Sequence, residues 1–343
     1  MNKADPIMVD YPTIALLPWL IIEDEVVIGE VHFVPFKRRS KSSNVPFVSQ
    51  ECARKIMSVY KDIDGRVIDR AVLAYHENQG TKGQLPEALF EEIFEASNIL
   101  AFSALSEKEY FSQLGENKSI NSAYFRTIFQ RFQEPCKDVS YKTRTLDGTI
   151  TNIDEMKRLK ISKPLQCIVK PVDMDRFKFN DDLIQALYNA KFGNDRCKRL
   201  KGAISQFLSA TKCDDWIARE QEYLDLIISY ERLFDGVNSA TDFADKISQI
   251  LDEYGSVKLL DSKRLSMKSV TKKNQSRFLH YEFLKESYKL RNIYAHGKSI
   301  GNMSLIWTER EHYIFGCWMF PLVVKKILQD EGYYVLSDYD EIC

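Results

Sequence analysis

In the second half of the chain, apolar residues recur every three or four positions in long segments separated by short polar stretches. This spacing places the apolar side chains on one face of an α-helix and predicts a helix for each segment. The predicted helices cover residues 181–191, 194–210, 214–234, 240–253, 274–295 and 308–330. The last of them contains Pro321, where we expect a kink. Consecutive amphipathic helices joined by short connections favour a helical bundle.

The first half of the chain mixes strand-like and helical patterns. Residues 13–22 and 26–36 are rich in β-branched and aromatic residues, and the acidic residues 23–25 between them predict a hairpin turn. Other predicted elements are strands at 71–75, 122–132, 140–146 and 165–171, and helices at 49–60 and 85–105. The sequence therefore predicts an α+β N-terminal domain in residues 1–175, followed by an all-α bundle in residues 176–343.

Composition narrows the class of protein without assigning a function. A chain of 343 residues is long enough for two domains of roughly 100–200 residues each. The apolar run at 14–22 is too short to span a bilayer and lacks the flanks of a signal peptide. The seven cysteines are odd in number and contain no Cys-x-x-Cys pair, which favours neither a zinc site nor a disulfide scaffold. We expect a soluble, cytoplasmic protein with no membrane contact and no metal or other cofactor.

A net charge of −1 for the whole chain conceals a strongly basic segment. Between residues 256 and 300 there are eleven basic and three acidic residues, a local charge of +8. Such a segment is typical of a surface that follows a phosphate backbone, although basic runs are also common in solvated loops. Its candidates for RNA contact are Arg277, Lys289 and Lys298.

The same segment contains the only residues whose pattern suggests chemistry. Arg291, Asn292 and His296 end the helix predicted at 274–295, and Gly297 follows at the position where glycine commonly terminates a helix. On an ideal helix Arg291 and His296 would point about 140° apart. His296 is therefore expected in the last turn or just beyond it, with its side chain and that of Arg291 largely exposed.

The pattern Arg291-Asn292-x-x-x-His296-Gly297 at the end of a long helix, followed by one further apolar helix, resembles the HEPN superfamily. The similarity covers residues 180–335, and the segment 230–234 on an earlier helix is similar to the Apea-like branch of that superfamily. The resemblance implies a metal-independent endoribonuclease that works as a homodimer, with the two motifs facing each other. It also makes Glu231 a candidate, because some members place an acid beside the arginine. The tyrosine that one toxin branch carries two residues after the histidine is absent, since that position is Lys298.

The chemistry of RNA cleavage agrees with these residue types. Attack by the 2′-OH needs a proton acceptor that works near neutral pH, and histidine is suited to that role. The charge that develops on the phosphate oxygens needs a fixed cation, and arginine offers paired donors. Asn292 can orient either group or contact the substrate.

Other interpretations of the same residues remain open at this point. Arg291 can be a surface ion-pair partner, His296 a charge that complements the helix dipole, and Glu231 an ordinary paired acid. Our leading hypothesis is an RNA-cleaving effector of the toxin or antiviral-defence type, in which residues 1–175 receive a trigger or bind an inhibitor. The alternative is a HEPN-like module that binds RNA or a nucleotide, or that dimerises, without catalysis.

Overall fold

The computed structural model forms two compact units, which are described separately. The first contains the β-sheet and the beginning of α2 (Glu87–Leu105), and the second contains the end of α2 and the helices from α4 onward. The division inside α2 falls between Ser97 and Asn98. The structure describes residues 13–40, 45–60, 67–80, 85–107, 122–131, 141–144, 150–153, 179–212, 219–251, 279–297 and 305–337.

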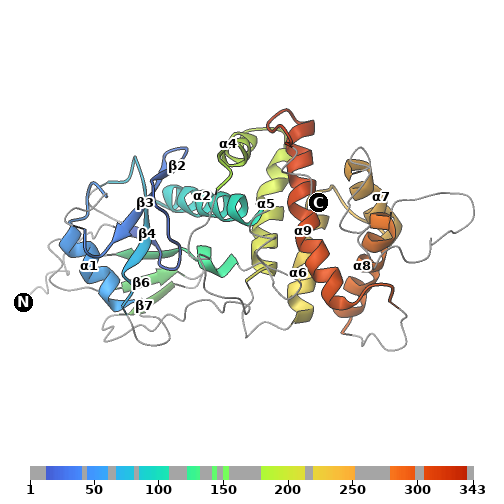
Figure 1. The fold of residues 1–343 in the computed structure, drawn as a ribbon, viewed down its shortest axis with the longest axis horizontal. Coiled ribbons are helices and arrows are strands. Elements are labelled where there is room, and N and C mark those ends of the chain that lie inside the picture. The colour runs from blue at the N-terminus through green and yellow to red at the C-terminus, as the bar shows by residue number, and fades with distance from the viewer. Residues whose placement is uncertain are drawn as a thin grey trace, which may run out of the picture. The chain divides into compact units, whose positions relative to one another are not determined.

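The first unit is built on an antiparallel sheet with the strand order β2-β3-β4-β1-β5 (Figure 1). The strands are β1 (Thr13–Leu17), β2 (Val26–Ile28), β3 (Val31–Lys37), β4 (Arg70–His76) and β5 (Ile128–Arg131). All five residues of β1 are buried, and the strand pairs with β4 on one side and β5 on the other. An uninterrupted apolar run suits such an inner strand because both of its faces are covered.

The hairpin predicted between residues 13–22 and 26–36 is wrong. Residues 26–28 pair instead with β3 through a tight turn at Gly29, whose φ of 60° is open to glycine without strain. The chain leaves β1 at Leu17 because Pro18 follows and has no N–H for a ladder. Local alternation identified two extended segments, but it could not identify their partners.

Most other predictions for this part of the chain are confirmed. The helix α1 (Gln50–Val59) begins after Ser49, whose side chain accepts a hydrogen bond from the Cys52 amide at 3.1 Å. Strand β4 and helix α2 lie at the predicted positions. Residues 122–125 form a 3-10 helix rather than a strand, and the strand predicted at 165–171 lies outside the described residues. A second hairpin joins β6 (Tyr141–Arg144) to β7 (Ile150–Ile153), and its second strand was not predicted.

The second unit is helical, and each helix lies where the apolar spacing predicted it. The helices are α4 (Asp181–Ala190), α5 (Asp195–Ala210), α6 (Arg219–Glu231), α7 (Ala240–Leu251), α8 (Leu279–Ala295) and α9 (Glu309–Asp330). The predicted residues 214–218, 252–253 and 274–278 lie outside the described part of the chain. The N-terminal sheet followed by helices agrees with the expected order of α+β and then all-α structure.

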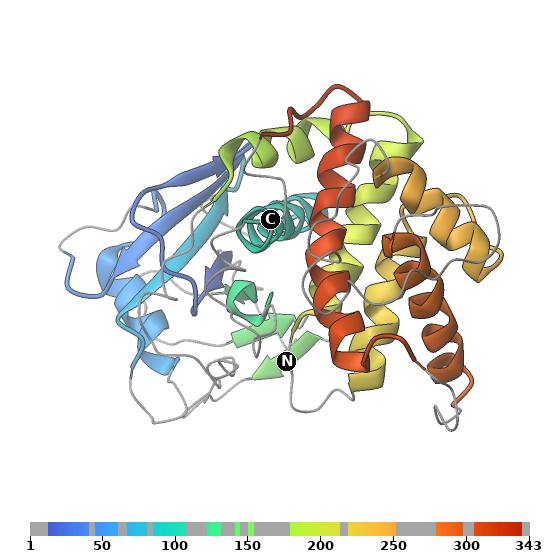
Figure 2. The same cartoon turned by 45° about the vertical axis from the view of Figure 1, so that its right-hand side comes forward.

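Helices α6 and α9 form the centre of the helical unit (Figure 2). Helix α6 packs against α5, α8 and α9, and α7 packs against α8 and α9. Gly316 lets α6 and α9 approach closely, because a Cβ there would lie 2.9 Å from a methyl group of Leu226. The Tyr230 hydroxyl donates to the Gly316 carbonyl at 2.6 Å in the same contact. Helix α8, which carries the predicted motif, therefore packs against α6, which is itself in close contact with α9.

Two further expectations concern cysteine pairing and membranes. Cys52 is disulfide-bonded, which the scattered cysteine pattern did not predict, whereas Cys197 and Cys317 are free and buried. Among the described residues, none of the helices combines the length and the apolar character needed to cross a bilayer.

Candidate functional site

The predicted motif lies at the C-terminal end of α8. The helix ends at Ala295, and Gly297 adopts a left-handed conformation with φ of 61°. The Gly297 amide donates to the Tyr294 carbonyl at 2.9 Å, which closes the last turn. His296 follows the last helical residue and is exposed, and its ring has no hydrogen bond to another described residue. The helix end and the exposure of His296 are as predicted.

Arg291 is held from two directions. One terminal nitrogen donates to the Glu231 carboxylate of α6 at 3.0 Å, and the other donates to the Asn292 side-chain oxygen at 3.1 Å. The guanidinium carbon lies 5.6 Å from the centre of the Tyr288 ring, within the range of a cation–π interaction. Three of the four predicted catalytic residues, Arg291, Asn292 and Glu231, therefore form one cluster, and the Tyr288 ring packs against the guanidinium.

The prediction that Arg291 would be largely exposed is wrong. Its side chain is 26% exposed and that of Glu231 is 18% exposed. The reason is that α6 lies alongside α8 and covers the arginine stem, while Glu231 compensates the charge. The Nε atom is also buried and has no hydrogen-bond partner in the described structure.

The cluster restricts the arginine without using all of its donors. A guanidinium carries five N–H groups, and the bonds to Asn292 and Glu231 occupy one on each terminal nitrogen. Burial, followed by the charge of Glu231, raises the pKa of Tyr288, so this tyrosine remains a neutral support for the cation. The arrangement can present the remaining terminal N–H groups to an anion in a fixed orientation.

The predicted RNA-contacting residues are only partly described. Lys289 is exposed on α8, two residues before Arg291. Arg277 and Lys298 lie outside the described residues, as does the rest of the basic segment before residue 279. The proposed electrostatic surface therefore stays a prediction.

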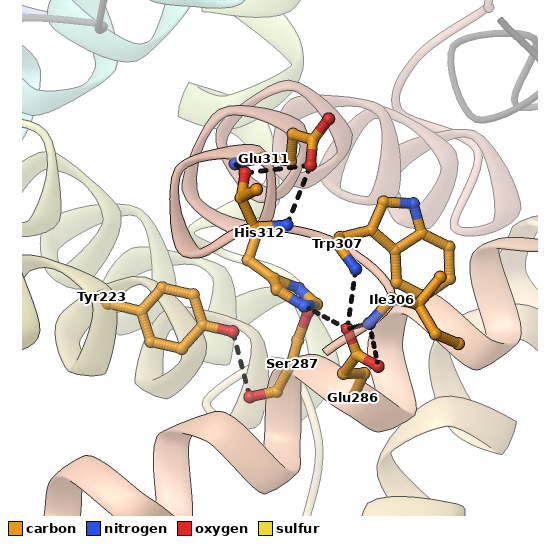
Figure 3. Close-up of polar contacts among 8 residues, drawn as sticks. Tyr223, Glu286, Ser287, Ile306, Trp307, Glu311 and His312 are labelled. Atoms are coloured by element: carbon orange, nitrogen blue, oxygen red, sulfur yellow. Dashed lines mark hydrogen bonds and ion pairs between the residues drawn. The ribbon is translucent and has the colours of Figure 1, made fainter. Parts of the chain in front are cut away.

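A buried polar network, which sequence reasoning missed, lies one turn before Arg291 (Figure 3). The Glu286 carboxylate is 2.9 Å from Nε2 of His312, and it accepts the Ile306 amide at 2.9 Å and the Trp307 amide at 3.1 Å. On the other side of the ring, Nδ1 of His312 is 2.7 Å from the Ser287 hydroxyl. The available signal was a carboxylate on the apolar face of α8, between Phe283 and Leu290.

Ser287, His312 and Glu286 have the composition of a serine-hydrolase triad but not its accessibility. His312 and Ser287 are 0% and 1% exposed, so no substrate reaches the hydroxyl. Ser287 also lies in the middle of a helix, and its carbonyl accepts a hydrogen bond from Tyr223 at 3.0 Å. The network joins helices and has no access for hydrolysis.

In the sheet unit, His32 lies among acidic residues. His32 stacks on Tyr75, with one ring nitrogen 2.6 Å from Glu25 and the other 2.8 Å from Glu77. Burial opposes the charged form of His32, but the two carboxylates outweigh it and raise the pKa. In the described part of the chain, no group of three or more His, Cys, Asp or Glu residues is arranged to hold a metal ion.

No protein-family model, curated protein or solved structure matches the chain. The functional argument therefore depends on the geometry of α6, α8 and α9 and on the residue pattern at the end of α8.

Proposed function

We propose that the helical unit is a metal-independent endoribonuclease of the HEPN type. The observation that carries the proposal is the arrangement at the end of α8. There, Arg291 is fixed by Glu231 and Asn292, while His296 is exposed beyond the helix end. A fixed cation and an available imidazole are the two groups that cleavage through the ribose 2′-OH requires.

In the proposed reaction, His296 accepts the proton of the 2′-OH as its oxygen attacks the phosphorus. The bond from phosphorus to the 5′-oxygen breaks, leaving a 2′,3′-cyclic phosphate on one fragment and a 5′-OH, once protonated, on the other. Arg291 stabilises the negative charge that develops on the phosphate oxygens. Asn292 and Glu231 hold the guanidinium, so they act as positioning residues.

The proposed site uses two chains. Arg291 packs against α6, while His296 lies past the end of α8, and their positions on an ideal helix differ by about 140°. A two-fold contact through the exposed end of α8 would bring His296 of one chain towards Arg291 of the other. Light scattering should accordingly give twice the chain mass in the preparation that cleaves RNA.

The test is cleavage of end-labelled single-stranded RNA by the wild-type protein, His296→Ala and Arg291→Lys. We expect each variant to lose about 10²–10³-fold in rate, because the first removes the base and the second replaces a two-pronged donor by a point charge. Activity should persist in EDTA, and the products should end in a 2′,3′-cyclic phosphate. Full activity of His296→Ala, or loss of activity in EDTA, would refute the mechanism.

A second candidate is a HEPN-like module that binds RNA or a nucleotide, or that dimerises, without cleaving. The observation in its favour is that both terminal nitrogens of Arg291 already have partners within the chain. Expression in a host cell separates the two functions: an active nuclease is toxic and becomes harmless as His296→Ala, whereas a binding module gives the same growth in both forms.

The wider role that we propose is that of a cytoplasmic toxin or antiviral-defence effector. In this role the sheet unit receives the trigger or binds an inhibitor. This part of the proposal rests on the resemblance of the motif to the HEPN superfamily, and on no contact within the sheet unit.

A further inference from the structure

Two cross-links join α8 to the start of α9, one on each side of Arg291. The first runs from Glu286 to His312 and to the backbone at residues 306–307. The second runs from the Tyr294 hydroxyl to the Glu309 carboxylate. The chain between α8 and α9 thus departs at Gly297 and returns to α8 at Glu286, next to the motif.

In the first cross-link, the Glu286 carboxylate is bonded to groups of the protein itself. The Glu286 carboxylate receives two backbone amides and the His312 ring, so its acceptors face protein donors rather than water (Figure 3). Its side chain is 10% exposed and that of His312 is 0% exposed. Removing one member of such a buried set leaves the others unsatisfied, and that cost keeps the set together.

Helix α6 supports the same part of α8 from a third direction. The Tyr223 hydroxyl donates to the Ser287 carbonyl, and the Tyr223 ring meets the Tyr294 ring edge to face at 5.7 Å. About two turns further along α6, Glu231 contacts Arg291. The segment from Ser287 to Tyr294 therefore has little freedom to rotate or to shift along its axis.

Arg291 and Asn292 lie within this clamped segment, and His296 lies two residues beyond it. We propose that Glu286, His312 and Tyr294 are positioning residues that hold the end of α8 in the one arrangement in which Arg291 and His296 can act on RNA. The inference rests on the proposed function and adds residues that touch neither substrate nor the reacting atoms. Their effect is on the chemical step, because a displacement of about 1 Å can reduce a reaction rate by about 10²-fold.

The experiment compares Glu286→Gln and Tyr294→Phe with a matched control, Lys325→Met. Tyr294→Phe keeps the ring contact with Tyr223 and removes only the hydroxyl, so it tests the idea in a protein that keeps its core. Lys325 is another buried charge of α9, bonded to the Ser106 carbonyl at 3.2 Å, and it lies more than about three turns along the helix from His312. The measurements are kcat, KM, the thermal midpoint and amide hydrogen exchange of residues 286–297 and 305–312.

We expect kcat to fall by up to about 10²-fold in Glu286→Gln and by a smaller factor in Tyr294→Phe. KM should stay within about twofold of wild type in both, because the basic groups that bind RNA are untouched. Exchange should rise at the Ile306 and Trp307 amides in Glu286→Gln. Lys325→Met should lower the thermal midpoint and leave kcat and this exchange unchanged.

Wild-type kcat in both folded cross-link variants would overturn the positioning role and leave the proposed function standing. A fall in kcat that Lys325→Met matches at the same loss of thermal midpoint would also overturn it, since general stability would then explain the effect. An inactive wild-type protein would instead refute the proposed function, and hydrogen exchange would still report whether the cross-links hold α8.

Discussion

The helical unit contains two acid–base pairs that lie one turn apart on α8 and differ in what surrounds them. Glu286 and His312 are enclosed, and nearly every donor and acceptor between them has a protein partner. Glu231 and Arg291 are about one-fifth and one-quarter exposed, and the guanidinium keeps N–H groups for an outside partner. The enclosed pair is suited to holding structure and the partly exposed pair to binding an anion, although each pair joins a glutamate to a basic residue.

The most direct test of this comparison is to remove the glutamate from each pair and to measure the stability. Glu286→Ala should lower the free energy of unfolding by about 3–5 kcal/mol, because it leaves a buried histidine and two backbone amides without their acceptor. Glu231→Ala should cost about 1 kcal/mol, because water reaches Arg291. Urea denaturation at pH 7 measures both values.

The control is Asp195→Ala, which removes an exposed ion pair with Lys198 and should leave stability nearly unchanged. Equal losses for Glu286→Ala and Glu231→Ala would show that exposure does not separate the two pairs.

Acid titration should reveal a smaller effect within the enclosed pair. Burial would raise the pKa of Glu286, but hydrogen bonds from His312, Ile306 and Trp307 outweigh it and hold the pKa below its ordinary value. The charged carboxylate therefore stabilises the fold above the pKa that it has in the unfolded chain. This contribution is lost as the pH falls through the lower folded pKa, at about 1.4 kcal/mol per unit of difference.

Urea unfolding of wild type and Glu286→Gln from pH 7 to pH 3 tests this sign. The stability difference between the two proteins should be constant down to about pH 5 and should shrink below about pH 4.5, where the unfolded carboxylate takes up a proton. A difference that stays constant to pH 3 would mean that the Glu286 carboxylate gains nothing from its donors.

The smallest expected effect concerns a charge outside both pairs. Lys289 is exposed on α8 and has no ion pair among the described residues. If it contacts a phosphate of single-stranded RNA, Lys289→Gln should flatten the slope of log K against log salt by about 0.7. Fluorescence anisotropy across a salt series measures the slope, and Lys198→Gln on α5 is the control. The same slope for wild type and Lys289→Gln would remove Lys289 from the RNA surface.

The sequence predicted those structural features that depend on residues close together in the chain. The helices of the second unit and the left-handed Gly297 followed from spacing and from one residue type, both of which act within a few positions. The pairing of β1 did not follow, because its partners lie more than fifty residues away. The contact of Glu231 with Arg291 was suggested by the family resemblance alone. The contact between Glu286 and His312 could not be predicted, because His312 lies in the first turn of α9, 26 residues further on.

The place of β1 in the sheet also determines when that sheet can form. This strand leaves the ribosome before both of its neighbours, residues 70–76 and 128–131. At about 5–20 residues per second, the nascent chain carries an apolar strand with an unpaired edge for on the order of ten seconds. The hairpin of β2 and β3 can close in microseconds during that interval. A translation product that stops before β5 would keep one edge of β1 open, and such an edge is a template for aggregation.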